Sequence, residues 1–167
     1  MIFTGQTGWM QGWKYGFILD STYNDFVSGE LEKMIYNCYI NENPDFILIE
    51  GQAALRNPSG PCGSEFLVSC DVDAVILQHS IKREYFDGWK DVGCKMPSLK
   101  SEIELINMYG KEVLAVTLNT SDMNEKEKKE TKINLEKELK IPIILPLDEG
   151  VDELLPLLIN LKKKHDN

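Results

Sequence analysis

The sequence has 167 residues, of which 43% are hydrophobic and 27% charged, a composition that excludes a disordered or fibrous chain. Its 27 acidic and 18 basic side chains give a net charge of -9, which disfavours nucleic acids and anionic membrane surfaces as partners. This length suffices for one domain with its own core, so we expect a single α/β domain over residues 1–167. A small anionic ligand is still compatible with the charge, because backbone N–H groups can bind it.

Short apolar runs alternate with longer amphipathic stretches, which indicates βαβ units and a mostly parallel sheet. Most of these runs lack a polar face, so we expect helices on both sides of the sheet, in a three-layer α/β/α fold. The predicted strands are residues 1–4, 17–20, 46–50, 74–78, 113–118 and 141–145.

Four helices are predicted between and after these strands. The first begins at residue 24 or 25 and ends near 41, with Phe26, Leu31 and Met34 among the apolar residues at helical spacing. The other three helices are residues 98–109, 124–139 and 151–163.

Between the first two helices, the turn-rich segment Arg56 to Gly63 has the chemistry of a functional loop.

The four cysteines are Cys38, Cys62, Cys70 and Cys94. They contain no C-x-x-C pair and, with only two histidines, make no zinc signature, so we expect no metal site of this kind. We interpret them as small buried hydrophobic residues rather than nucleophiles.

No apolar run approaches the roughly 20 residues of a membrane span, and no secretory leader is visible. These features predict a cytoplasmic protein with reduced thiols.

Ligands of open parallel sheets bind outside the carboxyl ends of the strands, so the residues after each strand are the candidates for a site. Here these residues are unusually polar. They are Gly5, Gln6, Thr7 and Gly8 after the first strand, Asp20 after the second, Glu50, Gly51 and Gln52 after the third, His79 after the fourth and Asn119 after the fifth, with Asp25 at the start of the first helix.

The segment from Gly5 to Gly8 could turn sharply and bring its backbone close to a ligand, while Gln6 and Thr7 supply donors and acceptors. That chemistry suits a phosphate, a pyrophosphate or a carboxylate. The alternative is a tight turn that holds no ligand.

Glu50 ends a very apolar run, where it could act as a general base or hold Mg²⁺, or could instead cap the neighbouring loop. Asp20 could share that site, whereas Asp25 is equally consistent with a helix cap. His79 could move protons or bind the phosphates of an acyl carrier, or be structural. Asn119 could read a base or amide edge, or cap the next helix.

Several of these residues belong to an ordered set of motifs. The motifs are T-G-Q-T-G at 4–8, Asp20, D-F-V-S-G at 25–29, E-G-Q at 50–52, P-S-L at 97–99 and L-N-T-S at 118–121. Together they resemble, over residues 1–145, the carboxyl-terminal domain of a P-loop family of unknown function. Members are often described as epimerase/dehydratase-like, and some are D-glutamate N-acetyltransferases. The resemblance implies a P-loop NTPase-like fold and acetyl-CoA as a cofactor.

The E-G-Q strand end is also similar to that of dethiobiotin synthetase, where the carboxylate faces Mg²⁺ and nucleotide phosphates. This similarity implies ATP with Mg²⁺ as another cofactor, and Asn119 at a base-reading position. The sequence departs from the family in lacking the Walker A loop G-x-x-x-x-G-K-[ST], so it resembles the later half of a longer member. It also has Asn57-Pro58 where family members tend to have His-Pro.

Three functions are compatible with these observations. The first is acyl transfer from acetyl-CoA to the amine of an acidic amino acid, with Glu50 or Asp20 as the base. The second is a nucleotide- or coenzyme-binding module that needs an amino-terminal half or a partner chain. The third is an inactive domain whose open sheet edge favours homo-oligomers. Hydride transfer is disfavoured, since no G-x-G-x-x-G opens a helix after a strand.

Overall fold

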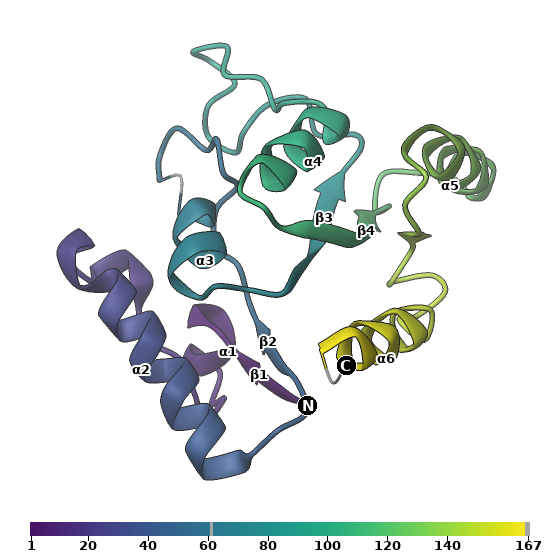
Figure 1. Cartoon of the computed structure of the whole chain (residues 1–167). Coiled ribbons are helices and arrows are strands. Elements are labelled where there is room, and N and C mark those ends of the chain that lie inside the picture. The colour runs from purple at the N-terminus through teal and green to yellow at the C-terminus, as the bar shows by residue number, and fades with distance from the viewer. Residues whose placement is uncertain (61, 166–167) are drawn as a thin grey trace. The chain divides into compact units, whose positions relative to one another are not determined.

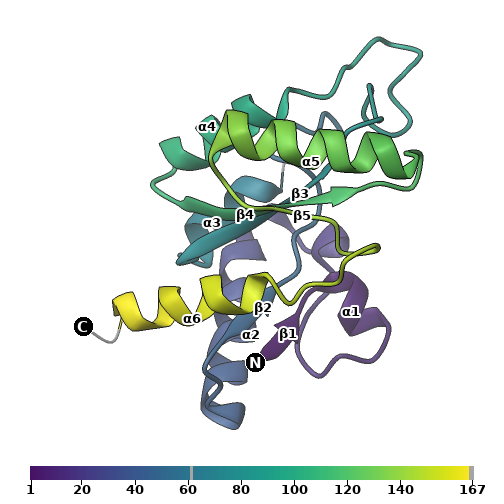
Figure 2. The same cartoon turned by 90° about the vertical axis from the view of Figure 1, so that its right-hand side faces the viewer.

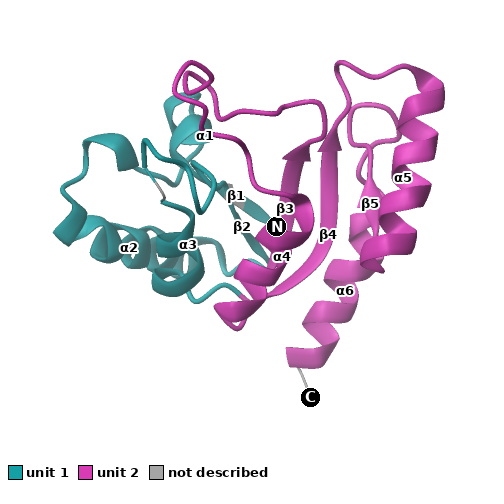
Figure 3. Cartoon of the chain, turned by 90° about the horizontal axis from the view of Figure 1, so that it is seen from above, with its two compact units in different colours: residues 1–72 teal, residues 73–167 magenta. Residues whose placement is uncertain are grey.

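A computed structural model describes residues 1–60 and 62–165 (Figure 1, with a second view in Figure 2). Pro61, which belongs to the predicted functional loop, lies outside the described residues. The chain divides into two compact units, Met1–Val72 and Asp73–Asn167, which are described one at a time (Figure 3). Each unit combines parallel strands with helices, which confirms the predicted α/β class. The expectation of one domain over residues 1–167 stays a prediction.

The first unit is built on a parallel pair of short strands. Strand β1 (Ile2–Thr4) pairs with β2 (Ile47–Ile49), so that Thr4 lies opposite Ile49. The other elements of this unit are α1 (Gln6–Met10), the 3₁₀ helix η1 (Leu19–Ser21), α2 (Asn24–Glu42) and α3 (Gly63–Ser69). The pairing puts the carboxyl ends of β1 and β2 at one edge.

Helix α2 supplies most of the core of this unit. Its buried side chains are Val27, Leu31, Met34 and Cys38, which share one face because they are three or four residues apart. The helix ends at Asn43, which adopts the left-handed conformation with φ 44° just before a proline. This face of α2 therefore fixes the helix against the rest of the unit.

The predicted strand at residues 17–20 is wrong. Leu19 begins η1, and the extended backbone before it makes only a single parallel bridge, between Tyr15 and Thr4. Gly16 follows with φ 149°, a conformation that side-chain-bearing residues rarely adopt, and this interrupts the pairing with β1. Helices α1 and α3 were not expected from the sequence.

The second unit contains a three-stranded parallel sheet with the order β3-β4-β5, flanked by helices. Figures 1 and 2 show α4 and α5 on one side of this sheet and α6 on the other. Strand β4 lies in the middle, and its side chains from Val113 to Leu118 are mostly buried. The elements are β3 (Ala74–Ser80), α4 (Leu99–Met108), β4 (Glu112–Asn119), α5 (Glu125–Leu139), β5 (Ile143–Ile144) and α6 (Leu154–His165).

Local signals define the helices of the second unit well. Ser98 caps α4 by accepting a hydrogen bond from the Ser101 backbone, and Asn124 with Glu127 forms a complete capping box at the start of α5. The predicted helices at 98–109, 124–139 and 151–163 correspond to α4, α5 and α6. No helix within the described ranges combines the length and apolarity needed to cross a membrane.

The fully buried Leu31 offers a test of the α2 packing, because its side chain is 0% exposed. We expect Leu31→Ala to lower the free energy of unfolding by about 2 to 5 kcal/mol, through lost burial and the cavity left behind. Urea denaturation followed by circular dichroism measures this loss. Leu147→Ala is the matched control, since Leu147 is 75% exposed and its change should stay within about 0.5 kcal/mol. Equal losses in the two variants would contradict the assigned core.

Candidate functional site

The candidate site begins where β1 and β2 end together. The Glu50 backbone N–H donates a 2.7 Å hydrogen bond to the Thr4 carbonyl oxygen, which holds Glu50 beside Gly5. A Cβ atom on Gly5 would lie only 2.3 Å from the Cβ of Glu50. Gly5 also has φ 154°, so both the space and the backbone conformation require glycine here. The E-G-Q motif and the T-G-Q-T-G motif therefore meet through a backbone contact.

The Glu50 carboxylate is held by the backbone of the same turn. Its Oε2 accepts a 3.1 Å hydrogen bond from the Gly8 N–H. Residues Gln6–Met10 form a helical turn, α1, rather than an open cradle, and the Gly8 N–H is occupied by Glu50. Gly8 is also needed for packing, because a Cβ there would meet the Trp13 ring at 1.9 Å. The phosphate-cradling role of the two glycines stays a prediction.

A second carboxylate, that of Asp20, is held at the same turn by hydrogen bonds with the side-chain amide of Gln6. Gln6 Nε2 donates to Asp20 Oδ2 at 2.7 Å, and the Asp20 backbone N–H donates to Gln6 Oε1 at 3.0 Å. Both ends of the Gln6 amide are thus used within the protein, so Gln6 orients Asp20. Glu50 and Asp20, which the sequence placed after different strands, are thus each hydrogen-bonded to a residue of the same turn, Gly8 and Gln6.

The remaining site residues of the first unit have simpler surroundings. Thr7 and Gly51 are exposed, while Gln52 is half-buried and lines a small hollow with Gly5 and Gln6. Asp25 is exposed in the first turn of α2, where a negative charge complements the helix dipole.

His79 and Asn119 belong to the second unit, at the carboxyl ends of β3 and β4. In the β3–β4 register, His79 pairs with Leu118 and Ser80 pairs with Asn119. Because side chains alternate along a strand, His79 and Asn119 extend from opposite faces of this sheet. Burial lowers the pKa of the His79 imidazole, which keeps the ring neutral at pH 7. Asn119 Oδ1 accepts hydrogen bonds from the backbone and hydroxyl of Ser121.

Burial works against activation of three of the four thiols. Burial raises the pKa of Cys70 to about 11, and burial also raises the pKa of Cys38. Burial is the main reason that the pKa of Cys62 is raised as well, with Glu65 and Asp20 adding to the shift. A raised pKa keeps a thiol protonated and poorly nucleophilic. No group of three His, Cys, Asp or Glu side chains within residues 1–60 and 62–165 is arranged to hold a metal ion.

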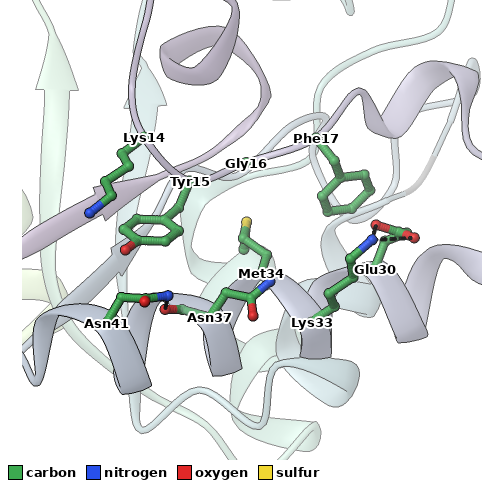
Figure 4. Close-up of a pocket in the computed structure, with 9 residues that line it drawn as sticks. All are labelled: Lys14, Tyr15, Gly16, Phe17, Glu30, Lys33, Met34, Asn37 and Asn41. Atoms are coloured by element: carbon green, nitrogen blue, oxygen red, sulfur yellow. Dashed lines mark hydrogen bonds and ion pairs between the residues drawn. The ribbon is translucent and has the colours of Figure 1, made fainter.

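The structure also shows a polar cluster that the sequence interpretation missed. Glu42 Oε1 accepts a 2.8 Å hydrogen bond from the Tyr15 hydroxyl and forms an ion pair with Lys14. The Lys14 hydrogen bond, with that of Tyr15, holds the pKa of Glu42 below its usual value. Figure 4 shows Lys14, Tyr15 and Phe17 opposite one face of α2, around a cavity of about 460 Å³. The repeated glycine and aromatic residues between positions 8 and 17 were the signal for this region.

Comparison with known proteins places these features in a family. A family model described as "Domain of unknown function (DUF1611_C) P-loop domain" matches residues 1–155. A Pseudoalteromonas sp protein named D-glutamate N-acetyltransferase is 26% identical over 159 residues, covering 91% of this chain and 46% of the relative. A crystal structure of a DUF1611 family protein from Anabaena variabilis ATCC 29413 has a TM-score of 0.81 at 26% identity, covering 95% of this chain and 47% of the other. The chain thus spans about half the length of these relatives.

The contact between Gly5 and Glu50 gives a direct test of the site geometry. We expect Gly5→Ala to destabilise the protein by about 1 to 3 kcal/mol or more, because alanine meets Glu50 and must adopt a strained backbone. Gly29→Ala is the matched control, since a Cβ there meets nothing within 4 Å and α2 is helical at this position. In that variant we expect a gain of about 0.5 to 1 kcal/mol. Thermal unfolding measures both, and a stable Gly5→Ala variant would contradict the geometry.

Proposed function

Because this chain belongs to the DUF1611 family, whose P-loop domain model it matches over residues 1–155, we propose that it contributes to acyl transfer from acetyl-CoA to the amine of an acidic amino acid. The observation that supports this most is the pair of carboxylates, Glu50 and Asp20, held on one turn at the strand ends. The name of the Pseudoalteromonas relative, D-glutamate N-acetyltransferase, supports the choice of donor and acceptor. D-Glutamate is the acceptor we propose.

The charge of the site supports a particular orientation of the amino acid. Glu50 and Asp20 are held by a backbone N–H and an amide, which orient the carboxylates without neutralising them. Two such carboxylates attract an ammonium group and repel the carboxylates of the substrate. The substrate amine would therefore enter first, toward Glu50.

In the proposed reaction Glu50 acts as the general base. It accepts a proton from the substrate ammonium, and the neutral amine then attacks the carbonyl carbon of the thioester. A C–N bond forms, the C–S bond breaks, and the leaving thiolate takes up the proton that the attacking nitrogen loses. Asp20, fixed by Gln6, would position the amine by a hydrogen bond.

A second candidate function is a nucleotide- or coenzyme-binding module without chemistry of its own. The P-loop description of the matching family model favours it. The sequence contains no G-x-x-x-x-G-K-[ST] loop, so such a module would hold phosphates through other groups. Acetyl-CoA and ATP with Mg²⁺ are the ligands that separate the two functions.

A thermal-shift titration of the 167-residue chain separates these functions. A ligand that binds the folded state raises its stability, by about 2.7 kcal/mol at a concentration one hundred times its dissociation constant. We expect stabilisation by acetyl-CoA and by D-glutamate, and less by L-glutamate. Stabilisation by ATP with Mg²⁺ alone would favour the nucleotide-binding module. If none of these ligands shifts the melting temperature, the acyl-transfer proposal fails for this chain.

Replacement of the proposed base tests its chemical role. We expect Glu50→Gln to lower the rate of CoA release with D-glutamate by about 10²- to 10⁴-fold, because the amide cannot accept the proton. The amide oxygen can still accept the Gly8 N–H, so the fold should be retained. Glu32→Gln is the matched control, since Glu32 is exposed on α2. A rate unchanged by Glu50→Gln would remove Glu50 from the mechanism.

A further inference from the structure

The last helix of the second unit is apolar on more sides than its own packing uses. Leucine and isoleucine occupy most positions from 154 to 161 in α6. Leu158 is 7% exposed and faces the rest of the unit, whereas Leu155 and Ile159, on the other side of the helix, are 50% and 51% exposed. A helix that is apolar all round is normally covered on every side. One face of α6 is therefore left without such a cover by its own unit.

This exposed face begins before the helix itself. Val151, four residues before Leu155, is 52% exposed. The carbonyl oxygens of Val151 and Asp152 accept hydrogen bonds from the N–H groups of Leu154 and Leu155, so this turn leads directly into the helix. Residues four apart lie on one side of a helix. We call Val151, Leu155 and Ile159 the α6 face.

Charges of opposite sign lie at the two ends of the α6 face. Asp152 is exposed at its start, next to Val151. Lys163 continues the row four residues after Ile159 and is also exposed. The rest of the last turn is basic too, with Lys162, Lys164 and His165. The face is thus apolar in the middle, acidic where it begins and basic where it ends.

A surface with this pattern is complementary to itself. If two copies of α6 pack antiparallel about a two-fold axis, midway between Leu155 and Ile159, each Leu155 meets Ile159 of the second copy. The same arrangement brings Asp152 of each copy to the basic last turn of the other, which contains Lys163. A parallel arrangement would place like charges together. Closed two-fold interfaces of this kind are the commonest in homo-oligomers.

Other features also favour a second copy as the partner. An anionic lipid surface is disfavoured, because the net charge of the chain is -9 and Asp152 lies at the start of the face. The family model ends at residue 155, so most of α6 lies beyond the residues that it matches. The α6 face is therefore a feature of this chain that the family description does not cover.

We propose that the α6 face is the interface of an antiparallel homodimer of this chain. Leu155 and Ile159 form its apolar centre, and Asp152 with Lys163 forms an ion pair on each side of the axis. Stable interfaces bury about 1,200 to 2,000 Å² in total, and a contact between two short helices is smaller. The dimer therefore dissociates on dilution. The proposal does not depend on acyl transfer.

Sedimentation equilibrium of the 167-residue chain over a range of concentrations tests the proposal. We expect a monomer–dimer equilibrium. Ile159→Glu should raise the dissociation constant at least about tenfold, because it places a carboxylate in the apolar centre of both copies. Ile133→Glu is the matched control and should leave the constant unchanged, since Ile133 is 63% exposed on α5. Circular dichroism checks that both variants fold.

Two results would overturn the proposed interface. The first is a chain that stays monomeric at millimolar concentrations. The second is a dimer that Ile159→Glu leaves intact, because its interface would lie elsewhere. Vesicles of phosphatidylglycerol test the alternative partner, and we expect the chain to stay in the supernatant when they are sedimented. Binding to these vesicles that Ile159→Glu abolishes would assign the face to a lipid surface instead.

A charge exchange tests the antiparallel arrangement. Asp152→Lys and Lys163→Asp should each weaken the dimer by about fivefold, because each replaces an attraction with a repulsion at both ends of the interface. The double variant restores opposite charges and should recover most of the lost affinity. A double variant that dimerises no better than the single variants would contradict the antiparallel arrangement.

Discussion

The close approach of Gly5 to its neighbours is the constraint on which the first unit depends. On one side the missing side chain makes room for Glu50, and on the other the Gly5 carbonyl oxygen lies only 2.5 Å from where a Cβ of Gly16 would be. Gly5 and Gly16 therefore let the segments that carry Gly5, Gly16 and Glu50 pack closely against one another. The position of the Glu50 carboxylate beside the Gly8 N–H is a consequence of this contact. A side chain at either glycine would force these segments apart.

Two pairs of acidic residues differ in what holds them. Glu42 is bound by Lys14 and Tyr15, and Asp148 is bound by Lys128 and Thr120; hydrogen bonds from these partners hold the pKa of both carboxyls below their usual values. Within the part of the chain that the structure describes, Glu50 and Asp20 are bound instead by neutral donors. Neutral donors fix the direction of a carboxylate and leave its charge available to a ligand. This difference is the electrostatic reason for placing the chemistry at Glu50 and Asp20.

The sequence predicted the features that depend on local periodicity. The apolar run in β4 and the start of α5 are local features, so both elements were found close to their observed ends. The capping role considered for Asn119 was wrong, because Asn124 caps α5 and Asn119 bonds Ser121 instead. On α2 the helical period was right, but Phe26 is 64% exposed and the adjacent Val27 is buried. A one-residue error of this kind arises because a wide apolar stripe does not show which of two neighbouring hydrophobic residues faces the core.

The features that were missed depend on contacts between distant residues. Residues 17–20 begin with three apolar side chains and resembled a strand, but Gly16 breaks the pairing with β1 and Leu19 enters a 3₁₀ helix. The contact of Tyr15 with Glu42 joins residues 27 positions apart, and no periodic pattern encodes it. Candidate site residues were found because parallel strands bring their carboxyl ends to one edge, a rule of topology that needs no side-chain detail.

The two hollows of the first unit share a wall. Phe17 and Met34 line the hollow of about 460 Å³ beside α2, and the same two residues line the small hollow beside Gly5, Gln6 and Gln52. Met34 is only 6% exposed and belongs with Leu31 to the buried core, so this wall is the same face of α2 that holds the helix in the unit. The packing of that face therefore sets the shape of the hollow beside the turn that binds Glu50.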